Sequence, residues 1–179
     1  VLVGTSESLI TIRDGEEIRS QNFEVGIDSI HGKGDHAIVI DGLGKAHLVK
    51  PTGDTIVLDA QSVLFAKISS KIAIATESGS VMTFDFSGKK EWERPKRGEV
   101  GERITAIGWD NDCLVVAREG HGLVPGDEEA LEVEYWISGT LKNRIDVKNR
   151  IVAIDGPWMG LDMGGVMLSL IHISEPTRH

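Results

Sequence analysis

Residues that could do chemistry gather in the segment EGHGLVPGDEEA (119–130), which holds a histidine and three consecutive acidic residues. Clustered carboxylates suit a hard cation such as Ca²⁺, but this acidic run lacks the alternating ligand spacing of a calcium loop. A solvated loop or a contact with a partner protein explains the segment better than a metal site. We therefore assign His121, Asp127, Glu128 and Glu129 to a candidate partner-binding rim and expect no metal.

Other reactive or charged side chains have simpler interpretations. The spacings of five and eleven residues between His31, His36 and His47 match no zinc pattern, so surface or packing roles are expected. Four tryptophans fall in four different expected strands, where packing between sheets explains them and a binding-rim role is open for Trp109 and Trp158. A basic cluster is best explained as a solvated outer edge, with docking of an acidic partner as the alternative; it comprises Lys89, Lys90, Arg94, Lys96 and Arg97.

Catalytic motifs are missing from the sequence. It contains no Gly-x-Ser-x-Gly elbow, no cysteine with a matched histidine and no Gly-rich phosphate loop that begins a helix. We assign no catalytic residue and no cofactor, and expect an interaction module more readily than an enzyme.

Composition restricts the kind of partner. The formal net charge is −9 and the pI is about 5.1, whereas nucleic acid or an anionic membrane would require a basic face. The single cysteine, Cys113, cannot form a disulfide within the chain and is expected to be buried. No apolar run is long enough to span a membrane. We therefore expect a protein partner.

The elements that must position these residues recur along the chain. Short apolar runs begin at residues 1, 37, 72, 114 and 159, so their starts lie 36, 35, 42 and 45 residues apart. This period is typical of a repeat architecture. Val, Ile, Thr and aromatic residues dominate runs of five to eight residues, and no 3.6-residue apolar period is sustained, which predicts strands.

Each complete repeat is expected to hold four strands. In the second to fourth repeats these are expected at 26–32, 36–42, 45–50 and 54–60; at 63–69, 71–77, 80–86 and 89–95; and at 103–109, 113–119, 131–137 and 140–147. The first repeat lacks its first strand and is expected at 1–7, 9–14 and 16–23, and the fifth has strands at 150–156 and 158–164. Third and fourth strands are separated by glycine turns at Asp14-Gly15, Thr52-Gly53-Asp54, Ser87-Gly88 and Ser138-Gly139.

Four antiparallel strands per repeat make one blade of a β-propeller. The predicted fold class is all-β, an incomplete β-propeller arc of four-stranded antiparallel blades, about four and a half blades truncated at both ends. The blades are expected at 1–23, 24–61, 62–97, 98–148 and 149–167. A complete ring would have seven or eight.

The last residues are interpreted separately. LSLIHISEPTR (168–178) resembles the in-frame translation of a transposase adapter used in sequencing libraries. We therefore expect residues 168–179 to be a non-native tail and exclude them from fold reasoning.

One segment carries a family resemblance. In SVMTFDFSGKKEWERP (80–95), Asp85, Gly88, Lys89 and Trp92 resemble the repeat of pyrroloquinoline-quinone-type propellers. In that family the Gly and Trp mainly hold adjacent blades together, so the resemblance implies blade packing and not cofactor binding. The WD-repeat propellers share the strand frame, but the dipeptides Trp109-Asp110 and Gly120-His121 stand in the wrong order and positions for their signature.

These observations predict a non-catalytic propeller scaffold that binds a protein through its rim or channel mouth. The alternatives are a quinone-dependent dehydrogenase propeller, which needs residues absent from these blades, and an exported lipoprotein-type assembly scaffold. The compartment is open, with the cytoplasm slightly favoured.

Overall fold

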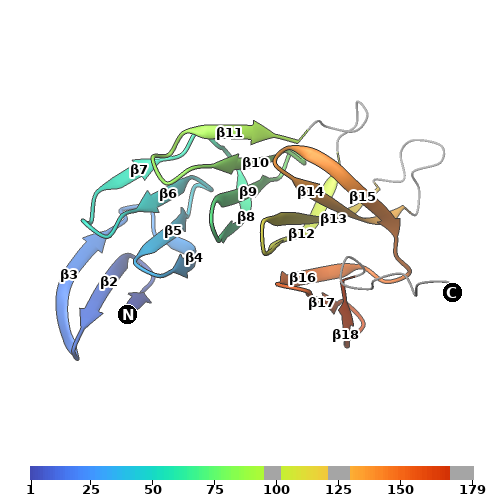
Figure 1. The fold of residues 1–179 in the computed structure, drawn as a ribbon. Coiled ribbons are helices and arrows are strands. Elements are labelled where there is room, and N and C mark those ends of the chain that lie inside the picture. Colours follow the sequence, from blue (N-terminus) through green and yellow to red (C-terminus); the bar gives the residue numbers. More distant parts are fainter. Residues whose placement is uncertain (95–101, 121–129, 170–179) are drawn as a thin grey trace, which may run out of the picture. The chain divides into compact units, whose positions relative to one another are not determined.

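The computed structural model describes residues 1–94, 102–120 and 130–169, and every regular element in them is a β-strand. The strands form five antiparallel sheets in which sequence neighbours pair (Figure 1). The chain divides into two compact units, Val1–Arg94 with three sheets and Pro95–His179 with two. The predicted fold class, an all-β chain of antiparallel blades making part of a β-propeller, is confirmed.

The blades of the first unit follow the chain. The first is β1 (Leu2–Gly4), β2 (Ser8–Arg13) and β3 (Glu16–Asn22); the second is β4 (Ile27–Lys33), β5 (His36–Asp41), β6 (Ala46–Val49) and β7 (Thr55–Val57); the third is β8 (Val63–Ile68), β9 (Ile72–Thr76), β10 (Val81–Phe84) and β11 (Lys90–Glu93).

The second unit has two blades. The fourth blade is β12 (Arg103–Asp110), β13 (Cys113–Glu119), β14 (Leu131–Ile137) and β15 (Thr140–Asp146), and the fifth is β16 (Ile151–Asp155), β17 (Trp158–Leu161) and β18 (Val166–Leu168). Strand β18 was not expected from the sequence. It places Leu168 opposite Trp158, and the Ser169 N–H donates to the Pro157 carbonyl at 2.7 Å. The origin of residues 168–179 stays a prediction, and residues 170–179 lie outside the described part.

Apolar cores lie between successive blades within each unit. The second strands β5, β9 and β13 are almost completely buried, because both of their faces are apolar and both are covered. In the first unit one core joins blades one and two around Leu9 and Val39, and another joins blades two and three around Leu48 and Phe84. In the second unit a core joins the two blades around Tyr135 and Met159.

One kind of hairpin turn recurs five times. Each turn has five residues. The backbone N–H of residue one donates to the carbonyl of residue five, and the N–H of residue four donates to the carbonyl of residue one. Residue four is Gly with φ of +70° to +89°. A side chain rarely adopts this conformation, which explains the glycine. The turns are 41–45, 50–54, 76–80, 85–89 and 161–165. The positive φ expected for glycine between third and fourth strands is confirmed at Gly15, Gly53, Gly88 and Gly139.

A β-bulge recurs near the start of each innermost strand, at the second residue of β4, β8 and β16 and at the third residue of β12. The extra, unpaired residue is Asp28 in β4, Leu64 in β8, Thr105 in β12 and Val152 in β16. A bulge leaves one residue out of the ladder and re-aims its side chain. Of the four unpaired residues, Asp28, Leu64 and Val152 are exposed and Thr105 is buried.

Candidate partner-binding rims

Each blade presents two ends to solvent. At the turn end, hairpins join the first strand to the second and the third to the fourth. At the loop end, the second strand connects to the third and one blade connects to the next. Partner contacts in propellers are built on such connections, so each predicted site residue can be assigned to an end.

Two of the six predicted rim residues, Trp109 and Trp158, are among the described residues. Trp109 is opposite Leu114 at the turn end of blade four. The segment that holds His121, Asp127, Glu128 and Glu129 lies outside the described residues. Its anchors Gly120 and Ala130, joined by a 2.9 Å backbone hydrogen bond, are at the loop end. The length of strand β13 therefore separates Trp109 from the anchor Gly120.

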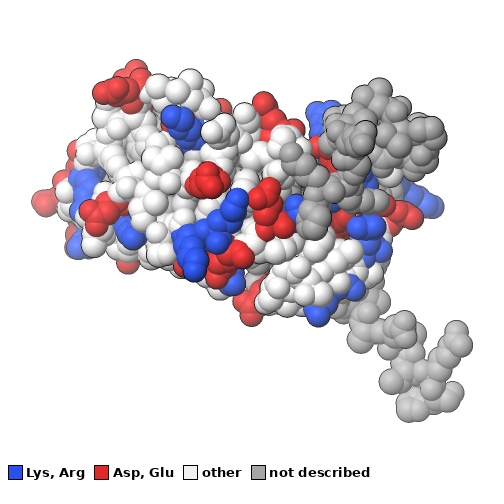
Figure 2. Space-filling view, turned by 90° about the horizontal axis from the view of Figure 1, so that it is seen from above, with Lys and Arg blue, Asp and Glu red and all other residues white. Residues whose placement is uncertain are grey.

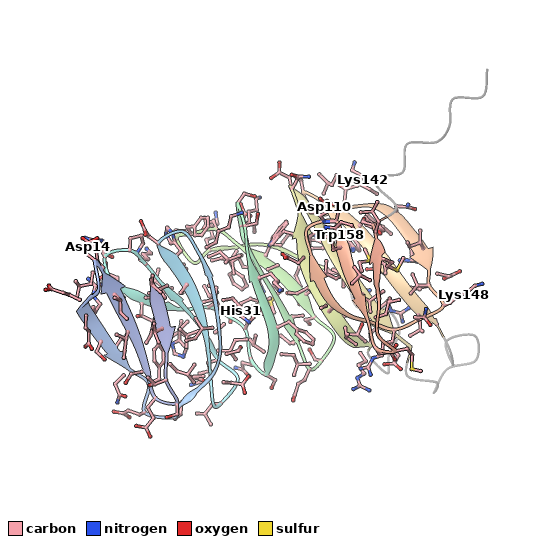
Figure 3. The ribbon with its side chains drawn as sticks, turned by 90° about the horizontal axis from the view of Figure 1, so that it is seen from below. Asp14, His31, Asp110, Lys142, Lys148 and Trp158 are labelled. Carbon is pink, nitrogen blue, oxygen red and sulfur yellow. The ribbon has the colours of Figure 1, made fainter. Side chains whose placement is uncertain are left out.

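Trp158 lies at the turn end of blade five. Its side chain is 55% exposed and its backbone pairs with Asp155 and Leu168. Figure 3 shows it at the same end of the second unit as Asp110, with Lys148 at the other end. Trp109 is only partly exposed, and its Nε1 is buried without a hydrogen-bond partner among the described residues. Trp158 is thus the freely accessible member of this pair.

The predicted blade-packing motif occupies the turn 85–89 and strand β11. The Asp85 carboxylate accepts hydrogen bonds from the backbone N–H groups of Ser87 and Lys89 at 2.8 and 3.0 Å. A Cβ on Gly88 would lie 2.8 Å from Cγ2 of Ile56 in the preceding blade. Trp92 pairs with Thr83 and is half-buried. Gly88 therefore packs directly against blade two.

The turn 41–45, whose motif was not expected from the sequence, repeats the pattern Asp-x-x-Gly-Lys of turn 85–89. Oδ1 of Asp41 accepts from the backbone N–H groups of Leu43 and Lys45, both at 2.9 Å, and Oδ2 lies 2.7 Å from Nε2 of His47. Burial opposes ionisation of Asp41, but the hydrogen bonds from His47 and these two N–H groups together lower its pKa. The shared pattern, readable in the sequence, was the signal for this turn.

The three histidines of blade two have packing surroundings. His47 makes an edge contact with the ring of Phe23, with centroids 5.3 Å apart, and His36 packs against Phe86 at 4.6 Å. Burial, with a smaller contribution from the charge of Lys67, lowers the pKa of His31 on the innermost strand β4 (Figure 3). Among the described residues, no group of three or more His, Cys, Asp or Glu side chains could hold a metal ion.

The loop end of the first unit is a continuous structure that we call the loop rim, residues 5–8, 23–28, 41–45, 58–64 and 76–80. Backbone hydrogen bonds join each segment to the next. They run from Ile27 N to Ser6 O (2.8 Å), Gly42 N to Gly26 O (3.1 Å), Val63 N to Gly44 O (2.9 Å) and Glu77 N to Ser62 O (2.9 Å). The segments therefore hold one another in place while their side chains reach solvent.

Charge is segregated on the loop rim. Its segments carry six acidic residues and one basic residue, whereas the rest of the first unit carries eight acidic and nine basic residues. The exposed carboxylates are Glu7, Glu24, Asp28, Asp59 and Glu77, and the basic residue is Lys45. On the face seen in Figure 2, in contrast, both signs are interspersed. The acidic excess of the first unit thus lies at one end of its blades.

Blade four holds a buried network of ion pairs. Arg118 contacts Glu102 through Nε at 2.5 Å and Glu132 through Nη1 at 2.6 Å, with the Arg118 and Glu102 side chains 1% exposed. Arg144 Nη2 lies 3.2 Å from Oε1 of Glu134, whose Oε2 accepts from the Trp136 indole at 2.9 Å. Pairing of this kind is what permits charges to be buried, so we interpret the network as structural.

Part of the predicted basic cluster is described. Lys90 pairs with Glu93 at 3.1 Å, and the Arg94 residue is buried. Lys96 and Arg97 lie outside the described residues. The described segments include no helix long and apolar enough to cross a membrane.

Comparison with known proteins finds similarity in fold alone. No family model and no curated protein matches the chain. Among solved structures, the WD40 domain of Neurospora crassa Pan2 superposes with a TM-score of 0.59 at 16% identity, covering 96% of this chain and 61% of that one. BamB from Moraxella catarrhalis gives 0.61 at 15%, covering 82% and 46%.

A third similar structure is BBS1N, solved in complex with ARL6DN, with a TM-score of 0.62, 17% identity and coverage of 92% and 59%. The chain therefore spans about half to three fifths of the length of these proteins. All three similarities support the β-propeller fold.

Proposed function

We propose that this chain is a non-catalytic β-propeller scaffold that binds a partner protein at one end of its blades. The loop rim carries the proposal. Four backbone hydrogen bonds fix five segments relative to one another, and the side chains between them remain exposed. Such a surface is ordered before it binds, which reduces the conformational entropy lost on association.

The comparisons support this function at the level of fold. BBS1N was solved in complex with ARL6DN, so a protein of similar fold does bind another protein. The turn end of the second unit, with the exposed Trp158, is the other surface available for a partner, because exposed aromatic side chains often anchor interfaces.

The experiment is site-specific photocrosslinking. The chain would carry p-benzoylphenylalanine at Leu43 on the loop rim, at Trp158 on the turn end, or at Val57, which is 59% exposed on the outer strand β7. It would be irradiated in an extract of the source cells, and adducts would be identified by mass spectrometry. One discrete adduct from position 43 or 158, absent from position 57, is expected. Equal adducts from all three positions, or none, would contradict a rim-binding scaffold.

A further inference from the structure

The loop rim also carries a group of exposed apolar side chains. Val25 is 46% exposed, Leu43 64% and Leu64 42%. They lie on three consecutive segments of the rim, and the hydrogen bonds from Gly42 to Gly26 and from Val63 to Gly44 join these segments. We call Val25, Leu43 and Leu64 the apolar patch.

The backbone beneath the apolar patch leaves little room for movement. A Cβ on Gly42 would lie 2.2 Å from the Val25 carbonyl oxygen, and one on Gly44 would lie 3.2 Å from Cα of Ser62. The turn is therefore in direct backbone contact with the connections on both sides. Leu43 is further held through its N–H, which donates to the Asp41 carboxylate at 2.9 Å.

Leu64 reaches the surface for a different reason. It is the unpaired residue of the bulge in β8, between Val63, which is buried in the core, and Phe65, which pairs with Ala75. In a regular strand this residue would pair with the neighbouring strand. The bulge leaves it unpaired, and its apolar side chain is exposed beside the turn 41–45. Apolar exposure here thus follows from backbone geometry on two separate segments.

Exposed carboxylates lie on the segments that carry the apolar patch or are joined to them, and Lys45 is the one basic residue there. Glu24 and Asp28 flank Val25 along the chain, Asp59 precedes Leu64 in the same connection, and Glu77 is joined to that connection by its backbone N–H. These four side chains are exposed and come from three segments. An apolar centre with distributed negative charge is complementary to a peptide that alternates apolar and basic residues.

We propose, resting on the scaffold function above, that the loop rim binds a basic amphipathic segment of a partner protein. Val25, Leu43 and Leu64 contact the apolar side chains of the segment. Glu24, Asp28, Asp59 and Glu77 face its Lys and Arg residues. The acidic charges raise the association rate and select against acidic segments, and the apolar contacts slow dissociation.

The test uses the full chain and two synthetic peptides, LKKLLKLLKKLLKL and its charge-reversed counterpart LEELLELLEELLEL, in fluorescence anisotropy titrations. The Lys peptide is expected to bind, with an affinity that falls as salt is added, and the Glu peptide is expected not to bind. Leu43→Ser and the pair Glu24→Lys with Glu77→Lys are each expected to weaken binding about tenfold.

Matched controls lie away from the loop rim. Val57→Ser removes an equally exposed apolar side chain from β7, and Asp54→Lys reverses an exposed charge in the turn 50–54 at the turn end. Both variants are expected to bind the Lys peptide like the parent chain. Far-ultraviolet circular dichroism would establish that every variant is folded.

Several results would overturn the proposal. These are equal binding of the two peptides, unchanged binding by the loop-rim variants, or equal loss in the controls. Loss of self-association in Leu43→Ser would show that a second copy occupies the patch, which also overturns it. If the photocrosslinked partner maps to position 158 and the Lys peptide does not bind, this inference fails while the scaffold function stands.

Discussion

The imidazole of His47 and the carboxylate of Asp41 meet across the hairpin of β5 and β6, with Nε2 and Oδ2 separated by 2.7 Å. The other carboxylate oxygen accepts the backbone N–H groups of Leu43 and Lys45. One side chain thereby holds both the turn and a neighbouring strand, and the same turn carries Leu43 of the apolar patch.

This arrangement makes stability depend on pH. Hydrogen bonds lower the pKa of folded Asp41 despite its burial, so its stabilisation is present above the unfolded pKa and is lost as pH falls through the folded pKa. Asp41→Asn should lower the free energy of unfolding by about 2 kcal/mol at neutral pH, by the typical value for hydrogen bonds to a charged group. The difference from the parent chain should shrink in acid, as measured by urea unfolding from pH 7 to pH 3.

Asp85→Asn is the matched control, because Asp85 occupies the same position of the same kind of turn but is only partly buried, whereas Asp41 is buried. Its effect should be smaller. Parallel pH profiles for Asp41→Asn and the parent chain would contradict the assigned role of Asp41.

Substitutions at two glycines should distinguish the free-energy cost of backbone strain from that of a steric clash. Gly88 and Gly164 both have positive φ at the fourth position of the recurring turn, but a Cβ at 88 would meet Ile56 whereas one at 164 would meet nothing within 4 Å. Gly164→Ala should cost about 1 kcal/mol and Gly88→Ala about 1 kcal/mol more. Thermal unfolding of both variants measures the difference, and equal costs would show that Ile56 yields to the added methyl group.

The buried ion pairs of blade four should respond strongly to the loss of one partner. Arg118→Met leaves Glu102 and Glu132 without this guanidinium and should cost about 3 to 5 kcal/mol. Arg103→Ala removes an exposed arginine 3.8 Å from Glu119 and should cost less than about 1 kcal/mol. Denaturant titrations compare the two variants. Similar losses of unfolding free energy in the two variants would mean that the buried network stabilises the fold no more than a surface ion pair does.

The thiol of Cys113 should be unreactive in the folded chain. Burial, and to a smaller extent the charge of Asp110, raises its pKa and lowers the fraction present as thiolate. Reaction with a disulfide reagent should be much slower in buffer than in denaturant. A fast reaction in buffer would show that the start of β13, where Cys113 lies, opens readily in the folded chain.

Exposed apolar side chains on the first and fifth blades predict self-association. They are Val1, Val3 and Ile18 in one case and Val152, Trp158 and Val166 in the other. Sedimentation velocity should show oligomers that increase with concentration and decrease in Val166→Lys, with Val57→Lys as control. A single monomeric boundary at every concentration would refute this prediction.

The sequence predicted most strands because their signals are local. Apolar runs such as 72–75 and glycines such as Gly53 and Gly88 determine strand and turn with little help from distant residues. The bulges could not be predicted, since Asp28, Leu64, Thr105 and Val152 share no residue type and the extra residue is visible only against its partner strand.

The candidate rim stays a prediction, because four of its six residues, His121, Asp127, Glu128 and Glu129, lie outside the described residues. A strand of seven residues separates the turn before Cys113 from the loop after Glu119. The direction of this strand sets Trp109 and Gly120, the last described residue before that segment, at opposite ends of blade four. The contact of His47 with Asp41, in contrast, could not be predicted from the sequence, because it depends on the register in which β5 pairs with β6.

The bulge on each innermost strand also affects how this fold can vary. The partner strand imposes no pairing on the extra residue, so exchanging it leaves the ladder intact. An acid, two aliphatic residues and a threonine already occupy the four equivalent positions. The three exposed positions, Asp28, Leu64 and Val152, therefore offer evolution, or a protein engineer, a place to diversify surface specificity without rebuilding the scaffold.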